Sequence, residues 1–515
     1  MLALLPSLAL VLAAQPLVEA AVEPVVEPVV EPVSESVFEP ALLHAERALW
    51  ASTSQVSVPP ATSPAMPAKL DAWLSSNLPA TPRLPLPARS DIDRIIATTC
   101  TRLLALQHPS AEDLAAQKLA AQNQGQERAE PCEWSYSCAY SVCGAPPLAF
   151  RIGGTAIVGI ALMSVPLVEN DTARRQALRR AIDHIVELST HPDISLEEFK
   201  GGFDVRNWAH CFGVRMLVAA DRAGLISNER RARVQLAIAR YTEALLQTEL
   251  AECGGWNYNR ASGDALVGHS CTFLTAHCIV SLCDVRDGGY PISVRDVEVN
   301  DLGSREVLDA PTPASKRDRA NERRILDGVI DRAFAAIERV RQPSGFLAYD
   351  SSGVGVIPNG QFVPECVGRL MVAEVASIRA GRVNLDRLRS SMQHFREAWK
   401  DLDRERGRGG VHEAPFGIAP YYFFFAFTAA AEAAHALPPA ERDEHLAFIR
   451  AVILSIRTPS GIYAGMWNDQ EYTGSVAYGS AMAILALVDR LAPRTELLDG
   501  QSKPAPVRGL DRDER

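Results

Sequence analysis

The chain has 515 residues, 47% of them hydrophobic, which is enough apolar material for a large core. Its 52 basic and 62 acidic residues give a net charge of −10 and form no basic stripe, which disfavours a nucleic-acid partner. Length alone predicts two or three domains, but this rule does not apply to helical repeat folds, which grow by adding units.

The first 20 residues, MLALLPSLALVLAAQPLVEA, are typical of a signal peptide. The apolar run from Leu2 to Ala14 is too short to span a bilayer as a helix. We therefore predict a signal peptide over 1–20 and an exported protein, periplasmic or secreted. No later segment predicts a stable membrane span.

Residues 21–89 begin with a Val-Glu-Pro repeat, AVEPVVEPVVEPVSESVFEP, and stay rich in Pro and Ser. Because Pro keeps the chain extended, we predict a mostly disordered linker there. A polar segment over 496–515 predicts a disordered tail. The stretch 90–495 between them predicts one helical domain, since helical periodicity replaces β-type alternation from Asp91 onward.

Within this stretch, nearly uniformly apolar helices alternate with charged amphipathic ones. The apolar helices are predicted to start near Ile152, Trp208, His269, Glu365, Tyr421 and Tyr478; the amphipathic ones cover 172–188, 228–250, 320–341, 384–402 and 440–456. A helix that is apolar all round must be buried, and a helix with one apolar stripe covers it. The alternation predicts an all-α fold, an α/α toroid of about six inner and six outer helices around a central cavity.

The segments before the apolar helices share an order: a glycine, an aromatic residue, a polar loop and a new helix. They read GGFDVRNWAH, CGGWNYNRASGDALVGHS, SGFLAYDSSGVGVIPNGQFVPE and SGIYAGMWNDQEYTGSVAYGS. Glycine permits the tight reversal, and the aromatic residue is expected to fill the gap between helix layers.

Four of these pieces carry a family resemblance: Gly254-Gly255-Trp256, the helix opening Ser270–Leu274, Gly345-Phe346 and Gly461–Tyr463. With them the chain resembles the prenyltransferase and squalene oxidase repeat family of the terpenoid cyclase and protein prenyltransferase superfamily. The resemblance implies an α/α toroid. It implies no particular activity, because one fold hosts many chemistries.

The catalytic motifs of that superfamily are missing or incomplete. The Asp-x-Asp-Asp motif that protonates alkenes in squalene cyclases has no counterpart, since the segment at Asp91 ends in Arg94. Zinc prenyltransferases place Asp and Cys two apart at an inner helix start, where this chain has His269 and Cys271, and use a later His that the helix at Tyr478 lacks. The thioester motif of complement-like toroids and the Cys-His-Gly signature of lanthionine cyclases are absent as well.

Polar residues nevertheless gather where the apolar helices begin, and parallel inner helices would bring these starts to one mouth of the cavity. Catalytic candidates by residue type are Asn207, His210, Glu365, Arg369 and Tyr421. Of these, Asn207, His210 and Tyr421, together with Arg206, suit the acid–base chemistry of a polysaccharide lyase. The pair of Glu365 and Asp469 suits glycoside hydrolysis.

A metal interpretation takes His210, His269, Cys271 and Cys366 as ligands of a tetrahedral zinc ion. Zinc is the one cofactor that the sequence suggests. Because these residues lack close ligand spacing, hydrogen-bonded core histidines with buried or disulfide-linked thiols are favoured. Packing also explains His277 and Cys278 deeper in the third apolar helix, and the aromatic run YYFFFAF.

The chain has ten cysteines, three of which cluster in CEWSYSCAYSVCG as Cys132, Cys138 and Cys143. Export would permit disulfides, but the pairing stays open. Taken together, the sequence favours an exported toroid that binds an apolar or polymeric ligand, or a partner, in its cavity. The alternative is an enzyme at the cavity mouth, either a zinc-dependent prenyltransferase-like or cyclase-like enzyme or a polysaccharide lyase or hydrolase.

Overall fold

The computed structural model describes residues 87–109, 130–136, 146–168, 170–197, 204–250, 252–258, 268–295, 316–357, 363, 366–406, 419, 421–469 and 475–488. All of them belong to one compact unit, Pro64–Arg515. The predicted signal peptide, nearly all of the predicted linker and the predicted tail lie outside these residues. Glu365, Cys138 and Cys143 lie outside them too.

The described part of the chain is all-α, with twelve α-helices, one short 3-10 helix and no strand. The apolar helices are α5 (Leu148–Ser164), α7 (Arg206–Arg222), α9 (Thr272–Gly288), α12 (Val367–Arg379), α14 (Tyr422–Ala434) and α16 (Val476–Leu487). The amphipathic helices are α3 (Arg89–Ala105), α6 (Thr172–Leu188), α8 (Asn228–Gln247), α11 (Lys316–Arg339), α13 (Leu385–Arg406) and α15 (Pro439–Ser455). The predicted all-α fold and its alternation of helix types are confirmed.

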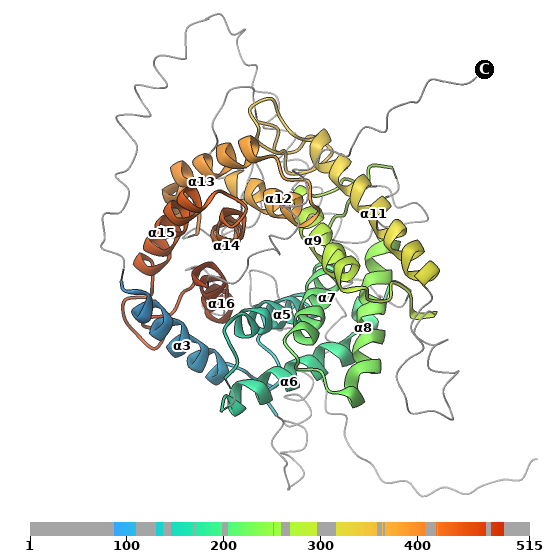
Figure 1. The fold of residues 1–515 in the computed structure, drawn as a ribbon, viewed down its shortest axis with the longest axis horizontal. Coiled ribbons are helices and arrows are strands. Elements are labelled where there is room, and N and C mark those ends of the chain that lie inside the picture. Colours follow the sequence, from blue (N-terminus) through green and yellow to red (C-terminus); the bar gives the residue numbers. More distant parts are fainter. Residues whose placement is uncertain are drawn as a thin grey trace, which may run out of the picture. The chain divides into compact units, whose positions relative to one another are not determined.

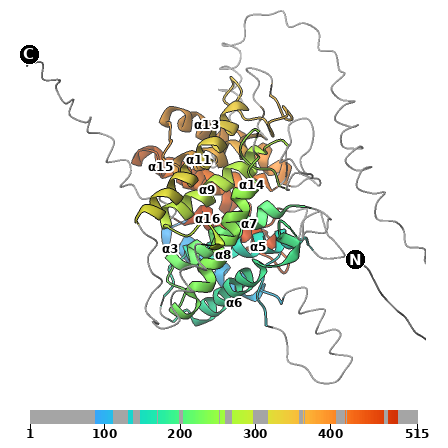
Figure 2. The ribbon, with the colours of Figure 1, turned by 90° about the vertical axis from the view of Figure 1, so that its right-hand side faces the viewer.

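The six apolar helices contact one another in a closed cycle, from α5 through α7, α9, α12, α14 and α16 back to α5. The amphipathic helices lie outside this cycle (Figure 1). In the view turned by 90°, the amphipathic helices α8 and α11 lie on the side that faces the viewer (Figure 2). The cycle is closed where α16, the last apolar helix, packs against α5, the first; the amphipathic α3 also packs against α16. The sequence predicts five amphipathic helices, each following an apolar one; the structure adds a sixth, α3, which precedes them all.

The two helix types differ in burial as their sequences predict. In α14 every residue except Thr428 is buried. In α13 the buried apolar residues Leu388, Met392, Phe395 and Leu402 form one stripe at helical spacing. Each fully buried side chain of this size stabilises the fold by about 1.5–3 kcal/mol relative to an exposed one.

Three tryptophans make the same pair of hydrogen bonds between helix layers. The indole N–H groups of Trp134, Trp256 and Trp467 donate to the carbonyls of Leu103 (2.7 Å), Leu245 (2.8 Å) and Ile453 (2.7 Å), near the ends of α3, α8 and α15. Their backbone N–H groups donate to the hydroxyls of Thr155 (2.9 Å), Thr275 (2.9 Å) and Ser480 (3.1 Å) in the next apolar helix. The expectation that an aromatic residue fills the gap between layers is confirmed at these turns.

Trp134 was not among the predicted turns, although the sequence contains a signal for it. Trp134 and Trp256 are each followed two residues later by a tyrosine, Tyr136 and Tyr258. Gly255 shows why the turn needs glycine. Its φ is 75°, and a Cβ there would lie 2.8 Å from Oγ1 of Thr275.

Among the described residues, no helix combines the length and the apolar character that crossing a bilayer requires.

Candidate functional site

The predicted site residues of α7 are bonded within the protein. The His210 ring is buried, with Nδ1 3.3 Å from Oδ1 of Asn207 and Nε2 3.0 Å from the carbonyl of Ile194. Burial lowers the pKa of His210 to about 4, so the ring is neutral near pH 7. The Asn207 amide donates to the carbonyl of Asn257 (2.9 Å), and its oxygen accepts from the Thr248 hydroxyl (2.8 Å). Both side chains therefore hold the α7 start to the neighbouring loops.

The structure does not gather the predicted metal ligands. His269 is exposed, whereas Cys271 is buried at the start of α9, where burial raises the pKa of its thiol. The buried Cys366 thiol lies 3.3 Å from Nη2 of Arg369. In the part of the chain that the structure describes, no three His, Cys, Asp or Glu side chains are placed to hold a metal ion.

Arg369 and Tyr421 also have protein partners. The fully buried guanidinium of Arg369 donates from Nε to the carbonyl of Leu347 (2.8 Å), which ties the preceding loop to α12. The Tyr421 hydroxyl is hydrogen-bonded to the hydroxyl of Tyr258 (2.9 Å). In the loop before α16, burial raises the pKa of Asp469 to about 6, although hydrogen bonds from Ser475 and Tyr136 lower it. The proposed pairing of this acid with Glu365 stays a prediction, because Glu365 lies outside the described residues.

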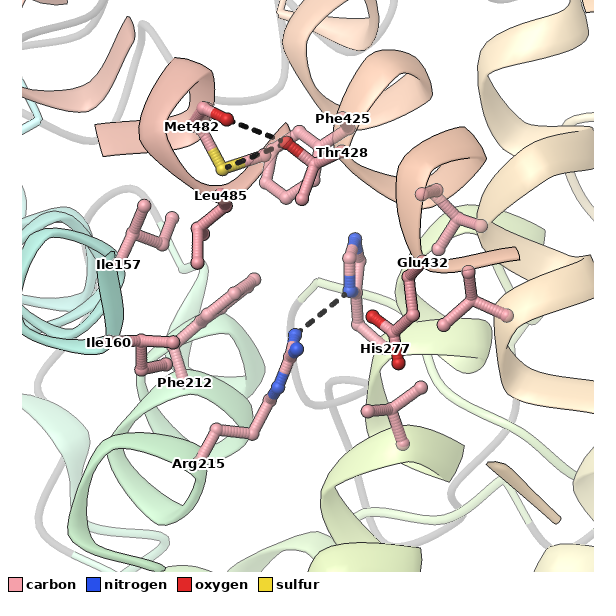
Figure 3. Close-up of a pocket in the computed structure, with 14 residues that line it drawn as sticks. Ile157, Ile160, Phe212, Arg215, His277, Phe425, Thr428, Glu432, Met482 and Leu485 are labelled. Atoms are coloured by element: carbon pink, nitrogen blue, oxygen red, sulfur yellow. Dashed lines mark hydrogen bonds between the residues drawn. The ribbon is translucent and has the colours of Figure 1, made fainter. Parts of the chain in front are cut away.

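A cavity of about 50 Å³ lies among the apolar helices, and all six of them contribute to its wall (Figure 3). The lining side chains are Ile157, Ile160, Phe212, Arg215, His277, Val280, Val372, Val375, Phe425, Thr428, Ala429, Glu432, Met482 and Leu485. Most of them are apolar. Ile160, Arg215 and Thr428 are only half-buried.

His277 brings a polar ring to the wall of this cavity, and one of its ring nitrogens has no hydrogen-bond partner. Its Nδ1 makes a long hydrogen bond of 3.5 Å with Nη1 of Arg215, while the buried Nε2 has no hydrogen-bond partner. A guanidinium can only donate, so Nδ1 accepts and the proton of the neutral ring sits on Nε2. Burial, aided by the charge of Arg215, lowers the pKa of His277 well below its usual value. A neutral N–H donor therefore faces an apolar cavity unpaired.

Glu432 supplies a carboxyl group to the same wall, and Figure 3 shows it beside Arg215 and His277. Burial raises the pKa of Glu432, and the charges of Arg379 and Arg215 oppose the rise. Its Oε1 lies 3.9 Å from Nη1 of Arg379, which also pairs with Asp284. Asp284, Arg379 and Glu432 lie toward the C-terminal ends of α9, α12 and α14, so these three helices run parallel.

Aromatic rings separate this cavity from the helix starts. The ring centroid of His277 lies 4.8 Å from that of Phe273, 4.9 Å from that of Phe425 and 5.3 Å from that of Phe212. Trp208, at the third residue of α7, packs over the edge of the same cluster at 6.1 Å. The prediction of core packing for the aromatic run is confirmed, with the addition that Phe425 also borders the cavity.

Sequence reasoning assigned His277 to packing and overlooked Arg215 and Glu432. The available signal was a charged or polar residue inside a helix that is otherwise apolar, as Glu432 is in YFFFAFTAAAEAA.

Comparison of the chain with protein-family models, with curated proteins and with solved structures found no match in any of the three. The structure defines a mostly helical protein of twelve packed helices within its described residues, and the geometry of the cavity carries the functional argument.

Proposed function

We propose that this chain is an α/α toroid of the kind found in terpenoid cyclases and protein prenyltransferases, and that it binds a small ligand in its central cavity. The closed cycle of apolar helices, the outer position of the amphipathic helices and the repeated tryptophan turn support the toroid. The segment over 1–20 supports export.

The unpaired Nε2–H of His277 is the observation that carries the binding proposal. Leaving a buried donor unsatisfied costs about 1–3 kcal/mol, and a ligand with an acceptor oxygen recovers that cost. Apolar side chains from all six helices suit a short hydrocarbon body on the same ligand.

The cavity volume limits the size of this ligand. A volume of about 50 Å³ has room for roughly four water molecules, at about 10–15 Å³ each. A long isoprenoid chain, the substrate type of the resembled cyclases, exceeds it. The ligand class is therefore a compact apolar molecule with one carbonyl, hydroxyl or ether oxygen.

Binding is favoured over catalysis by the protonation state of His277. A general acid or base works best with a pKa near the working pH, and burial keeps the pKa of His277 far below that range. His210, Arg369 and Tyr421 are engaged by protein groups. The zinc-dependent and polysaccharide-cleaving alternatives draw less support from this geometry.

Saturation-transfer NMR with acetone and isobutene tests the proposal, because these four-heavy-atom probes suit the cavity volume and differ mainly by one acceptor oxygen. We expect the wild-type chain to bind the ketone more tightly than the hydrocarbon. His277→Leu should abolish the preference, and His277→Gln, which keeps an N–H donor, should retain part of it. An equal response to both probes in the wild type, or a ketone preference that survives in His277→Leu, would refute the proposal.

A further inference from the structure

A second cavity lies between the outer helix α8, the start of α7 and the segment 189–197 that follows α6. Its volume is about 270 Å³, against about 50 Å³ for the central cavity. One face of α8, from Arg240 to Gln247, forms much of its wall, and Val294 lies at its edge. This α8 cavity shares none of its lining residues with the central cavity and has a different chemical character.

Arg240 brings to the α8 cavity a positive charge that no described group neutralises. Its side chain is half-buried, and no hydrogen bond or ion pair joins its guanidinium to any residue that the structure describes. Arginine stays charged in proteins, and its guanidinium can donate two parallel hydrogen bonds to one carboxylate. The unused donors of Arg240 are therefore open to an anionic group of a ligand.

Glu243 lies one turn further along α8 and faces the same cavity, yet it forms no ion pair with Arg240. Its carboxylate is held elsewhere: Oε2 accepts from the backbone N–H of Val294 (3.0 Å), and Oε1 accepts from the side-chain amide of Gln247 (3.3 Å). A carboxylate has about four lone-pair sites, so acceptor capacity remains on both oxygens. A fixed negative group thus lies beside an unpaired positive one.

The other titratable groups of the wall disfavour a ligand that is only anionic. Glu197, which is exposed, adds a second carboxylate to the cavity. His210 borders the cavity too, but burial lowers its pKa to about 4, so it adds no positive charge near pH 7. One positive and two negative groups would repel a phosphate or a dicarboxylate, whereas they complement a ligand that carries both an ammonium group and a carboxylate.

The size and the remaining surface of the α8 cavity define the rest of the ligand. Residues three apart on a helix have their Cβ atoms about 5–6 Å apart, so Arg240 and Glu243 are spaced to reach two charged groups on the same carbon atom. Ile194, Leu196 and Val294 add apolar surface. The volume of about 270 Å³ has room for roughly twenty water molecules, at about 10–15 Å³ each, and leucine is smaller than that.

We propose that the α8 cavity is a binding site for a free α-amino acid with an apolar side chain. Arg240 pairs with the carboxylate of the ligand, and Glu243 accepts hydrogen bonds from its ammonium group. Ile194 and Leu196 contact its side chain. This site is independent of the central cavity, which is too small for such a ligand and whose wall suits an uncharged one.

L-Leucine is the probe for this site, and isothermal titration calorimetry on the full chain measures its binding. Leucinamide keeps the ammonium group and lacks the carboxylate, whereas N-acetyl-leucine keeps the carboxylate and lacks the ammonium group. We expect leucine to bind about tenfold or more tightly than either analogue, because a hydrogen bond to a charged group is worth about that factor. His277→Leu should bind leucine like the wild type, so this proposal and the one for the central cavity fail separately.

Two variants assign the contacts. Arg240→Gln should weaken leucine binding about tenfold or more and remove the preference over leucinamide. Glu243→Gln should weaken leucine binding and remove the preference over N-acetyl-leucine. Arg233→Gln is the matched control, because it removes an exposed arginine of α8 that does not line the cavity, and it should bind leucine normally.

Circular dichroism checks that each variant is folded. Should a variant unfold, the comparison of the three probes on the wild type decides. The absence of detectable leucine binding, equal binding of the three probes by the wild type, or wild-type leucine affinity in folded Arg240→Gln would each overturn the proposal.

Discussion

His210 and His277 lie on neighbouring apolar helices, both buried and both neutral, yet their surroundings differ. Each ring nitrogen of His210, near the start of α7, lies within hydrogen-bond distance of a protein acceptor oxygen, so the single N–H of the neutral ring is paired. His277, in the middle of α9, has one nitrogen bonded to Arg215 and one without a partner, facing the cavity. The two rings therefore differ in whether their N–H donor is paired, whereas residue type and proximity to a helix start do not identify the unpaired one.

This difference between the two rings follows from the hydrogen-bonding needs of the backbone around each of them. A helix start leaves N–H groups unsatisfied, and the loop before it carries further polar groups, so nearby polar side chains are used to tether these segments. Asn207 does so with the carbonyl of Asn257 and the hydroxyl of Thr248. In the middle of a helix the backbone is already paired, and a polar side chain that faces the cavity finds few partners.

The largest expected effect tests whether the helix starts serve stability. Trp256→Ala removes a fully buried indole and leaves the carbonyl of Leu245 without its donor. We expect a loss of about 3–5 kcal/mol in the free energy of unfolding, measured by urea denaturation. Trp399→Ala in α13, where the ring is half-buried, serves as a control and should cost clearly less. Similar losses in both variants would contradict the role of the tryptophan turn.

Acid should destabilise the protein through His210. Its pKa is about 4 in the folded chain and about 6.5 unfolded, so the unfolded state binds more protons between these values. Its contribution is therefore intact above pH 6.5 and lost as the pH falls toward 4, by up to about 3 kcal/mol. Asp469, whose pKa is raised, acts in the opposite sense, so the measurement compares the wild type with His210→Asn. Identical pH profiles of unfolding for the two proteins would refute the assignment.

The smallest expected effect concerns the cavity. His277→Leu removes an unsatisfied buried donor, so the free energy of unfolding should stay unchanged or rise by about 1 kcal/mol. Urea denaturation of the two proteins side by side measures this. A loss above 2 kcal/mol would show that His277 serves packing, as its apolar surroundings had first indicated.

The helices were predictable from sequence because their signals are local. Burial on all sides leaves YFFFAFTAAAEAA no polar face, and the stripe in α13 repeats at helical spacing. Which polar atoms stay unpaired was not predictable, because that depends on contacts between distant segments. The ring of His210 meets Ile194, and that of His277 meets Arg215, 62 residues earlier in the chain.

The most direct test of the central claim is ¹⁵N NMR of the chain labelled at histidine, titrated with acetone. The ring resonances of His277 should show a neutral ring protonated at Nε2, and they should move as the ketone binds. Those of His210 should stay in place, because its single ring N–H is already paired within the protein. A His277 ring that does not respond to the ketone, or a His210 ring that responds equally, would contradict the account.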